Sequence, residues 1–508
     1  MLTLERLVAK TSLSCFTEYK KIREEKMLTL VNTNMMLPAI APIGLDYIAF
    51  SAQKAGFEVE ILDLALAEEP IKEMKKYFSN HQPELVGVSF RNVDDCFWPS
   101  AEWFVPKLKD SIKTIKSLTE APILLGGVGF SIFAGSILKY TGADFGIRGD
   151  GETAIIELIR QLQGKSVFSD VPGLLWEENG TIFSNRPSWP ETISLATNRD
   201  FIDNKRYFKL GGQCGLETKR GCNRRCIYCA DPLAKGGKLR LRNPSEVADE
   251  VKSLIQQGID VLHFCDSEFN IPRNHAYAVC EELKKRSLGR DFRWYAYLSP
   301  VRFDAELAGI MAEAGCVGID FTGDSGCESM LQNYRQEHTR EDLAEAVKFC
   351  RINDIAVMID LMVGGPGETE ETVKETIEFI KKINPDCAGA ALGIRIYPGT
   401  HMETIAAREL EGGGEGCIRR KYSGNIDLFK PTFYISEGLG ENPGQLVRDL
   451  IGGDQRFFEP EVESKFQARE GGIDSGYNYN RNKTLEDAIE KGARGAYWDI
   501  LRQLRKGE

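Results

Sequence analysis

Three closely spaced cysteines constrain this chain more than any other feature of its sequence. Cys222, Cys226 and Cys229 have the spacing CxxxCxxC and follow a strand-like run at 215–219. One short loop therefore brings three thiolates to one point, where a zinc ion or a cubane iron–sulfur cluster ordinarily takes four protein ligands. Three cysteine ligands leave one metal position for an outside molecule, which suits a cluster that binds its substrate.

A structural zinc knuckle, or three buried cysteines without a metal, is the alternative interpretation. Zinc modules pair their first two ligands with a second CxxC or HxxxH about 15 to 20 residues away, and this chain has no such partner. Cys214 lies in a glycine-rich segment upstream and is a poor fourth ligand.

The cysteine loop resembles the cluster loop of the radical S-adenosylmethionine (SAM) superfamily, including the aromatic Tyr228 just before the third cysteine. The resemblance implies a 4Fe-4S cluster held by Cys222, Cys226 and Cys229, which are then both metal ligands and catalytic residues. It also implies that the amino and carboxylate groups of SAM chelate the free iron, and that Tyr228 lies at the cofactor.

Composition bounds the rest of the chain. At ~150 residues per domain, 508 residues suggest about three domains. Sixty-four Lys and Arg against 75 Asp and Glu give a net charge of −11, so we expect no nucleic-acid partner. Thirteen scattered cysteines, an odd number, favour a reduced cytoplasm over a disulfide framework. The N-terminus lacks signal-peptide features, and proline and glycines break the uncharged run at 121–138, so we expect no membrane span.

Residues 27–163 alternate short apolar strands with helical periods, after an amphipathic helical extension at 1–26. Five successive βα units predict a doubly wound, Rossmann-like parallel sheet in an α/β domain, with its ligand beyond the carboxyl ends of the strands. We expect strands near 28–32, 57–63, 84–90, 121–126 and 143–148, and helices near 43–55, 68–78, 100–117, 131–140 and 152–163.

Unusual loops follow the third, fourth and fifth of these strands. Glycine in such a loop lets a bulky ligand approach the backbone closely. A nucleotide is the generic alternative ligand, although no GxGxxG opens the first helix and no P-loop is present. The candidate ligand-binding residues are Ser89, Arg91, Asn92, Gly126, Gly127, Gly129 and Gly149.

This domain resembles the cobalamin-binding domain that precedes the cluster in one branch of the radical SAM enzymes. Residues 42–45 match its first helix, and Gly126-Gly127 match its fourth loop. Other cobalamin proteins carry a DxHxxG histidine after the first strand, but no histidine occurs here before His81. The resemblance therefore implies cobalamin without a histidine lower ligand, as in the methyltransferase branch.

A linker is expected at 164–212, with a hairpin at 171–183 that turns through Asn179-Gly180. Strands and helices alternate again from 213 to about 400, and six such units predict a partial β/α barrel with catalytic loops at the carboxyl ends of its strands. The cysteine loop follows the first strand. We expect strands near 215–219, 260–265, 292–298, 316–322, 355–362 and 388–396, and helices near 244–256, 275–286, 304–314, 340–352 and 369–382.

Polar residues suited to SAM follow the second and fourth barrel strands. The radical SAM family often has Gly-Gly-Glu after its second strand to hold the SAM amino group, and the resemblance implies that role for Glu268. An exposed helix-capping acid is the alternative for Glu268. Asp324 and Ser325 follow the fourth strand, where a carboxylate and a hydroxyl suit the ribose of SAM.

Two further candidates follow the fifth and sixth strands. Gly364 and Gly365 resemble the glycine-rich turn that lies beside adenine in the family, and an ordinary strand-to-helix turn with Thr369 as N-cap has the same pattern. Arg395 offers a fixed positive charge to the SAM carboxylate, with a plain surface arginine as the alternative. Residues 401–508 are expected to form a small mixed domain that closes the open side of the barrel and shapes the substrate pocket.

Taken together, the resemblances imply a cobalamin-dependent radical SAM C-methyltransferase. In that family cob(I)alamin takes a methyl group from one SAM, and the cluster cleaves another SAM to a 5′-deoxyadenosyl radical that removes a substrate hydrogen. The substrate carbon radical then captures the cobalt-bound methyl group. An external one-electron reductant such as ferredoxin or flavodoxin, and an anaerobic cytoplasm, are expected with this chemistry.

Two other functions stay open at this point. One is a cobalamin-dependent radical SAM enzyme that cyclises or rearranges its substrate without methylating it, and the other is a corrinoid carrier or redox sensor without turnover. A methylthiotransferase is disfavoured, because Cys15 and Cys96 alone cannot hold a second cluster in the N-terminal half. The family resemblance covers peptides, protein side chains, antibiotics and lipids as substrates, and we expect a peptide or protein side chain.

Overall fold

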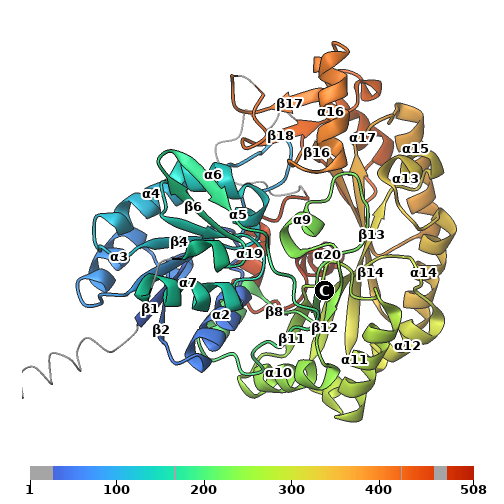
Figure 1. The fold of residues 1–508 in the computed structure, drawn as a ribbon. Helices are drawn as coiled ribbons and strands as arrows, with labels where there is room; N and C mark the ends of the chain where they lie inside the picture. The colour runs from blue at the N-terminus through green and yellow to red at the C-terminus, as the bar shows by residue number, and fades with distance from the viewer. Residues whose placement is uncertain (1–26, 165–166, 425, 463–476, 508) are drawn as a thin grey trace, which may run out of the picture.

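The computed structural model describes residues 27–164, 167–424, 426–462 and 477–507, so the helical extension expected at 1–26 lies outside the described residues. Two large sheets dominate the described part, one in the N-terminal half and one in the C-terminal half (Figure 1). Both consist mainly of parallel strands joined by helices, which confirms the predicted α/β class.

The first sheet has the strand order β2-β1-β3-β4-β5-β6-β7, and its first five strands are parallel. This order reverses direction between β1 and β3, the point where doubly wound sheets bind ligands beyond their carboxyl ends. The strands are β1 (Met27–Asn32), β2 (Glu58–Asp63), β3 (Leu85–Ser89), β4 (Ile123–Gly126) and β5 (Phe145–Ile147).

Helices cover both faces of this sheet, and each face has its own apolar core. Met74, Leu108 and Ile137 pack on one face, while Leu45 and Leu158 pack on the other. The predicted double winding is therefore present. The helices are α2 (Ile43–Lys54), α3 (Pro70–Phe78), α4 (Val105–Lys116), α5 (Val128–Ile132), α6 (Ala134–Thr141) and α7 (Glu152–Gln163).

The predicted hairpin forms, but it is not part of a free linker. Strands β6 (Leu174–Glu178) and β7 (Thr181–Ser184) turn through Asn179 and Gly180, whose φ angles of 52° and 82° are typical of a tight hairpin turn. β6 pairs antiparallel with β5, because Leu174 and Leu175 are buried there. The first part of the 164–212 connector thus extends the first sheet, and α8 (Asn204–Gly211) follows it.

The second sheet has the order β19-β15-β14-β13-β12-β11-β8 and is parallel throughout. Six of its strands are the six predicted β/α units, and its core packs against the outer helices. The strands are β8 (Cys214–Leu216), β11 (Val261–Phe264), β12 (Arg293–Leu298), β13 (Cys316–Asp324), β14 (Ala356–Val363), β15 (Cys387–Leu392) and β19 (Phe457–Phe458). The helices are α10 (Pro244–Gln256), α11 (Arg273–Lys285), α12 (Ala305–Glu313), α13 (Glu328–Tyr334), α14 (Arg340–Ile352) and α15 (Glu370–Ile383).

The C-terminal part extends the barrel sheet and packs against it. β19 adds a seventh strand beside β15, and Trp498 of the last helix packs against Tyr295 of β12. A small antiparallel sheet, β16-β18-β17, stands above the barrel (Figure 1). Its strands are β16 (Ile394–Arg395), β17 (Ile418–Arg420) and β18 (Thr432–Tyr434), and the helices are α16 (His401–Glu411), α17 (Pro443–Ile451), α19 (Lys483–Glu490) and α20 (Tyr497–Lys506).

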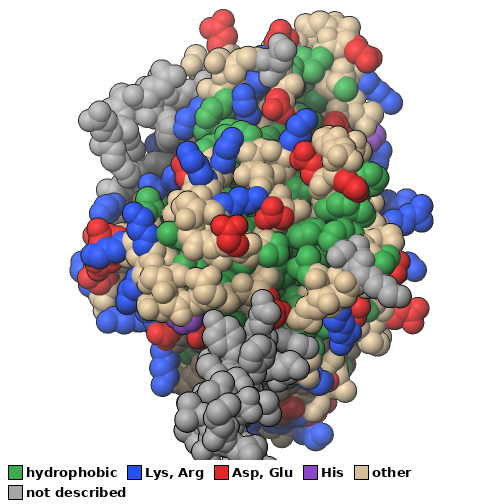
Figure 2. Space-filling view, turned by 60° about the vertical axis from the view of Figure 1, so that its left-hand side comes forward, with side chains coloured by type: hydrophobic (Ala, Val, Ile, Leu, Met, Phe, Trp, Pro, Cys, Tyr) green, Lys and Arg blue, Asp and Glu red, His purple; other side chains and the backbone are tan. Residues whose placement is uncertain are grey.

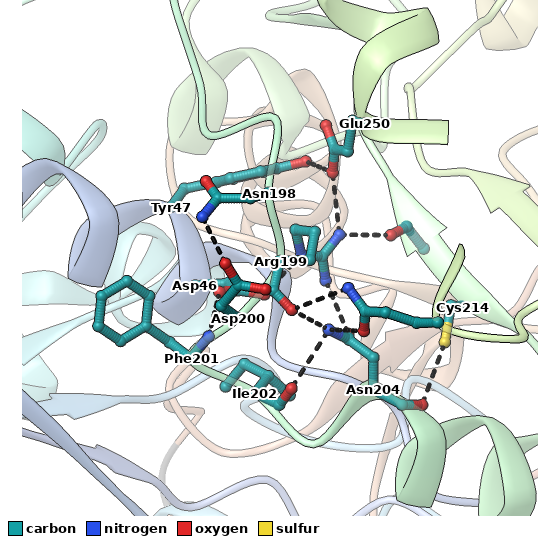
Figure 3. A network of polar contacts seen from close by, with 12 residues as sticks. Asp46, Tyr47, Asn198, Arg199, Asp200, Phe201, Ile202, Asn204, Cys214 and Glu250 are labelled. Atoms are coloured by element: carbon teal, nitrogen blue, oxygen red, sulfur yellow. Dashed lines mark hydrogen bonds and ion pairs between the residues drawn. The ribbon is translucent and has the colours of Figure 1, made fainter. Parts of the chain in front are cut away.

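Buried ion pairs join the two halves. Arg199 lies between Asp46 of α2, at 2.6 Å, and Glu250 of α10, at 3.0 Å, and all three side chains are fully buried (Figure 3). The Tyr47 hydroxyl donates to Glu250 at 2.8 Å, and Arg242 adds a 2.6 Å ion pair to the same carboxylate. Since every charge in this network has an opposite partner, the network holds the first sheet in a fixed orientation to the barrel.

The outer surface mixes charges of both signs. On the face shown in Figure 2, acidic and basic side chains are interspersed around hydrophobic ones. Within the described residues, no helix has the length and apolar character needed to cross a membrane.

Candidate active site

The cysteine loop runs from β9 (Lys219–Arg220) to α9 (Asp231–Lys235), and β9 pairs with β10 (Arg240–Leu241). Gly221 opens the loop at φ 88°, and a Cβ there would collide with the carbonyl oxygen of Lys238. The Cys222 amide donates to the Gly236 carbonyl at 3.0 Å, and Cys229 donates to Cys226 at 3.3 Å. Backbone contacts therefore fix the loop before any metal is bound.

The thiols of the loop influence one another electrostatically. Burial raises the pKa of Cys229 well above its ordinary value, and the negative charges of Asp231, Cys226 and Cys222 add to this effect. No group of three or more His, Cys, Asp or Glu side chains in the described ranges has the geometry of a single-ion site. A cubane cluster is wider than one ion and carries positive charge, so three spaced, desolvated thiols on one loop suit a cluster better than a lone metal.

Polar groups from the barrel surround the second cysteine. Tyr228 donates its hydroxyl to Asp324 at 2.6 Å, and the amide nitrogen of Gln336 contacts the Cys226 sulfur at 3.4 Å. Gln336 also donates to Tyr228, at 3.2 Å, and to Asp324. Asp324 is thus placed beside the cysteine loop, as the sequence predicts, and burial raises its pKa to about 6.

Glu268 has an unpartnered carboxylate oxygen, and its charge lies near the cysteine loop. Its Oε1 accepts from Thr322 at 2.9 Å, while its buried Oε2 has no hydrogen-bond partner in the described ranges. Burial raises the pKa of Glu268 to about 7, opposed by the Arg224 guanidinium. Neighbouring Asp266, by contrast, is already paired with Lys219 at 3.1 Å. Glu268 is therefore the acid of this loop available to an amino group, as SAM binding requires.

Ser325 does not join this group. Its hydroxyl lies 2.8 Å from that of Thr376 in α15 and accepts from the Cys327 amide at 3.1 Å. Both contacts engage the hydroxyl within the protein, and contact of Ser325 with the ribose of SAM stays a prediction. Strand β13 bends here, because Asp324 has a positive φ of 55° and the register shifts between Thr322 and Asp324.

The Gly364-Gly365 turn is closed by its own glutamate. Both amides donate to Glu368 Oε2, and burial raises the pKa of this acid to about 7. A Cβ on Gly365 would collide with Tyr334, so the glycine is needed for packing. Thr369 caps α15 as predicted. Contact of either glycine with adenine stays a prediction.

Arg395 lies at the junction between the two halves and forms its contacts there. It pairs with Asp94 at 2.9 Å, both side chains are 1% exposed, and its other nitrogens donate to the carbonyls of Ile396, Leu428 and Thr432. The alternative of a plain surface arginine is therefore wrong, because the side chain is buried. Contact of Arg395 with the SAM carboxylate stays a prediction.

The candidate cobalamin residues divide into two groups. Ser89 ends β3, and Arg91 and Asn92 lie in the loop after it, where Arg91 is exposed and contacts Asn92 at 2.8 Å. Burial raises the pKa of Cys265 and of Tyr297, and the positive charge of Arg91 lowers both values. The loop after β3 therefore faces the barrel interior.

The glycines mostly serve the protein's own packing. A Cβ on Gly127 or Gly129 would lie within 3.0 Å of the backbone of Phe90 or Arg91, and one on Gly149 would lie 2.8 Å from Trp189. Gly126 is different, since nothing lies within 4 Å of its Cβ position. Of the four, Gly126 alone has an open Cβ position, and contact of any of these glycines with cobalamin stays a prediction.

The first histidine of the chain is remote from this edge. His81 lies between α3 and β3, at the amino end of the sheet, and pairs with Glu60 at 3.2 Å.

Two residues near the cysteines were not predicted, Arg224 and Gln336. Arg224 lies inside the motif, whereas Gln336 comes from a loop with no recognisable sequence signal.

These features define an enzyme that combines a corrinoid domain with a radical SAM barrel. Residues 216–380 match the Radical SAM superfamily, and residues 36–159 match the B12 binding domain. The chain belongs to the cobalamin-dependent radical SAM enzymes, in their methyltransferase branch.

Two relatives indicate where in this branch the chain lies. Tryptophan 2-C-methyltransferase of Streptomyces laurentii is 29% identical over 570 residues, which covers 93% of this chain and 95% of that protein. Cytidylyl-2-hydroxyethylphosphonate methyltransferase of Streptomyces wedmorensis is 26% identical over 486 residues, covering 83% and 88%.

A solved structure agrees with this placement. The radical SAM methyltransferase TsrM from Kitasatospora setae, with tryptophan and a SAM analogue bound, superimposes with a TM-score of 0.86 at 27% identity, covering 95% of this chain and 99% of that one. Its form with cobalamin and a 4Fe-4S cluster gives 0.84 at 26% identity. The chain is thus a C-methylating radical SAM methyltransferase whose cofactors are cobalamin, a 4Fe-4S cluster and SAM.

Proposed function

We propose that this enzyme methylates a carbon of an indole-containing small molecule of the tryptophan type. The observation that carries the proposal is the similarity to a tryptophan 2-C-methyltransferase over almost the whole of both chains, including the parts outside the two matched domains. The inner face of the barrel supports it, because Tyr297 and Tyr479 offer aromatic surface there.

The chain's own residues bind and orient the reactants. Cys222, Cys226 and Cys229 would hold the cluster, and Glu268 Oε2 would accept hydrogen bonds from the SAM amino group. Asp324, positioned by Tyr228 and Gln336, would hold polar groups of the same SAM. The loop after β3 and Gly126 would receive the corrin. When bound, the cluster supplies an electron for cleaving SAM and cobalamin carries the methyl group.

Cobalamin is proposed to bind without a histidine below cobalt. The support is the position of His81 at the opposite end of the sheet from the loops after β3 and β4. Absorption and electron paramagnetic spectra of the loaded protein report a nitrogen ligand directly.

Reduction and cellular setting form a further part of the proposal. An external one-electron donor such as ferredoxin or flavodoxin is the expected partner, working anaerobically in the cytoplasm. The mixed surface charge and the net charge of −11 favour a substrate other than nucleic acid.

The test is anaerobic turnover of the reconstituted enzyme with SAM, a reductant and tryptophan, with a tryptophan-containing peptide in parallel. Methylated tryptophan together with S-adenosylhomocysteine supports the proposal, and methylation of the peptide alone would instead establish the peptide substrate expected from the sequence. 5′-Deoxyadenosine without S-adenosylhomocysteine would indicate a cyclase or rearrangement enzyme. If Cys222→Ala leaves function intact, the chain is a carrier or sensor.

A further inference from the structure

Two aspartates face each other on the inner side of the barrel sheet. Asp320 lies on β13 and Asp360 on β14, and the strand register makes them diagonal neighbours. Alternate residues of a strand point to opposite faces, and Phe321 and Ile359 are buried on the helix side. Both carboxyls therefore point into the barrel, and Asp320 lies four residues before Asp324 on the same strand.

The two carboxyls share a hydrogen bond, and no described residue forms an ion pair with either of them. Asp320 is 6% exposed, and neither its Oδ1 nor that of Asp360 has a hydrogen-bond partner in the described part of the chain. Asp94 and Asp266, by contrast, form ion pairs with Arg395 and Lys219. An unpaired buried carboxyl is costly, so these two oxygens are suited to an incoming donor.

The charge state of the pair follows from its surroundings. Burial raises the pKa of Asp360 to about 7, and burial and the charge of Asp360 raise the pKa of Asp320 well above its ordinary value. Glu268 and Asp324 add repulsion from the cysteine side. At neutral pH the pair is therefore only partly ionised, and a cation bound beside it favours the ionised form.

Aromatic side chains flank the pair. Tyr297 is 40% exposed on this inner face, which leaves space above its ring, and the His263 ring lies 4.8 Å from it. The hydroxyl of Tyr479 is buried without a hydrogen-bond partner in the described residues. Burial raises the pKa of both tyrosines, and the charges of Asp320 and Asp360 raise it further, so the two hydroxyls lie near the carboxyls.

We propose that Asp320, Asp360 and Tyr479 form the binding site for a protonated amino group of an aromatic substrate, with the substrate ring beside Tyr297. The three unpartnered oxygens match the three N–H donors of an ammonium group, and an ionised carboxylate of the pair offsets its positive charge. The inference rests on the proposed function and narrows it, because it requires the indole substrate to carry an amine.

The decisive variant replaces both acids. A single Asp360→Asn change still leaves the Asp320 carboxyl, which a bound cation can ionise. Asp320→Asn/Asp360→Asn removes the charge and preserves the side-chain volumes. Asp354→Asn is the matched control, since Asp354 is exposed just before β14 at a φ of 54°, which asparagine tolerates.

The probes are tryptamine and tryptophol, which differ only in an ammonium or a hydroxyl group. Calorimetric titration of the cofactor-loaded wild-type protein is expected to show tryptamine binding at least tenfold more tightly. The double variant should lose this preference through an affinity for tryptamine about 10- to 100-fold weaker, the range for a hydrogen bond to a charged group. Tryptophol affinity should change little. The cobalamin spectrum and thermal transition of the variant report its folding.

Each outcome decides between the two proposals. If wild type methylates tryptophan but the double variant still prefers tryptamine, the amine site is wrong and the proposed function stands. If no indole is methylated while tryptamine binding depends on the two aspartates, the function is wrong and the amine site stands. If wild type binds tryptamine no better than tryptophol, the amine site is overturned whatever the methylation result.

Discussion

At the scale of single residues, the free oxygen of Glu268 separates binding acids from structural ones. Asp266, two residues earlier, is bound by Lys219 and Thr218. In Glu268 only one carboxylate oxygen accepts a hydrogen bond, from Thr322. A carboxylate kept partly unpaired in a buried place costs stability, and such places are typical of ligand sites.

Glu268→Gln should weaken SAM binding by about 10- to 100-fold, because the amide can still contact Thr322 but lacks the charge that attracts the SAM amino group. Equilibrium titration of SAM into the cluster-loaded protein measures the effect. Glu281→Gln, an exposed position on α11, is the control. Equal SAM affinity in wild type and Glu268→Gln would remove Glu268 from the site.

Arg395→Met should behave as a stability variant. It leaves Asp94 buried and unpaired, which costs about 3–5 kcal/mol of unfolding free energy. Adding Asp94→Asn should recover part of that loss. Denaturant unfolding measures both, and SAM titration of the folded protein should show unchanged affinity. A SAM affinity that falls more than tenfold without loss of stability would support the role expected from the sequence.

At the scale of elements, the neighbouring strands β13 and β14 place Asp320 and Asp360 beside each other on the inner face of the barrel. An acid whose pKa is higher in the folded than in the unfolded state makes the folded protein bind more protons. Stability is then greatest below the unfolded value near 3.8 and declines as pH rises toward about 7, the folded value for Asp360. These acids therefore oppose folding at neutral pH unless a ligand neutralises them.

Asp320→Asn/Asp360→Asn should accordingly raise the melting temperature at pH 7.5 and flatten its decline between about pH 5 and pH 7. The reason is that amides carry no charge to bury. Differential scanning calorimetry of wild type and variant across this pH range is the measurement, with Asp354→Asn as control. A variant less stable than wild type at pH 7.5 contradicts this account.

Elements with strong periodicity were predictable from the sequence. Helices α2, α10 and α14 lie within one residue of their expected limits, because apolar residues recur at helical spacing along them. Two features were not predictable because they depend on partners far away in the sequence. These are the two-residue strand β19 and the position of the β6–β7 hairpin at a sheet edge. The same holds in the site. The cysteines and Glu268 stand in local motifs, whereas the partner of Arg395 lies 301 residues away.

At the scale of the whole molecule, the Arg199 network makes the two halves one unit. Three charged side chains with no exposure span α2, the connector and α10. A buried network of this kind tolerates little rearrangement, because moving one partner leaves the others without compensation. Both candidate cofactor regions therefore keep a constant separation.

Arg199→Met should lower the free energy of unfolding by about 3–5 kcal/mol, since Asp46 and Glu250 lose their shared partner. Retention of cobalamin during gel filtration should fall as well. Arg160→Met, which removes only an exposed pair with Glu157, should cost less than about 1 kcal/mol. Equal losses in the two variants would show that the network does not hold the halves together.

The late position of β19 and α20 in the chain has a consequence for biosynthesis. The ribosome makes the cysteine loop more than two hundred residues before Phe457, which begins the seventh strand, and Trp498, which packs under Tyr295. A nascent chain therefore displays its thiols while one flank of the sheet is still missing.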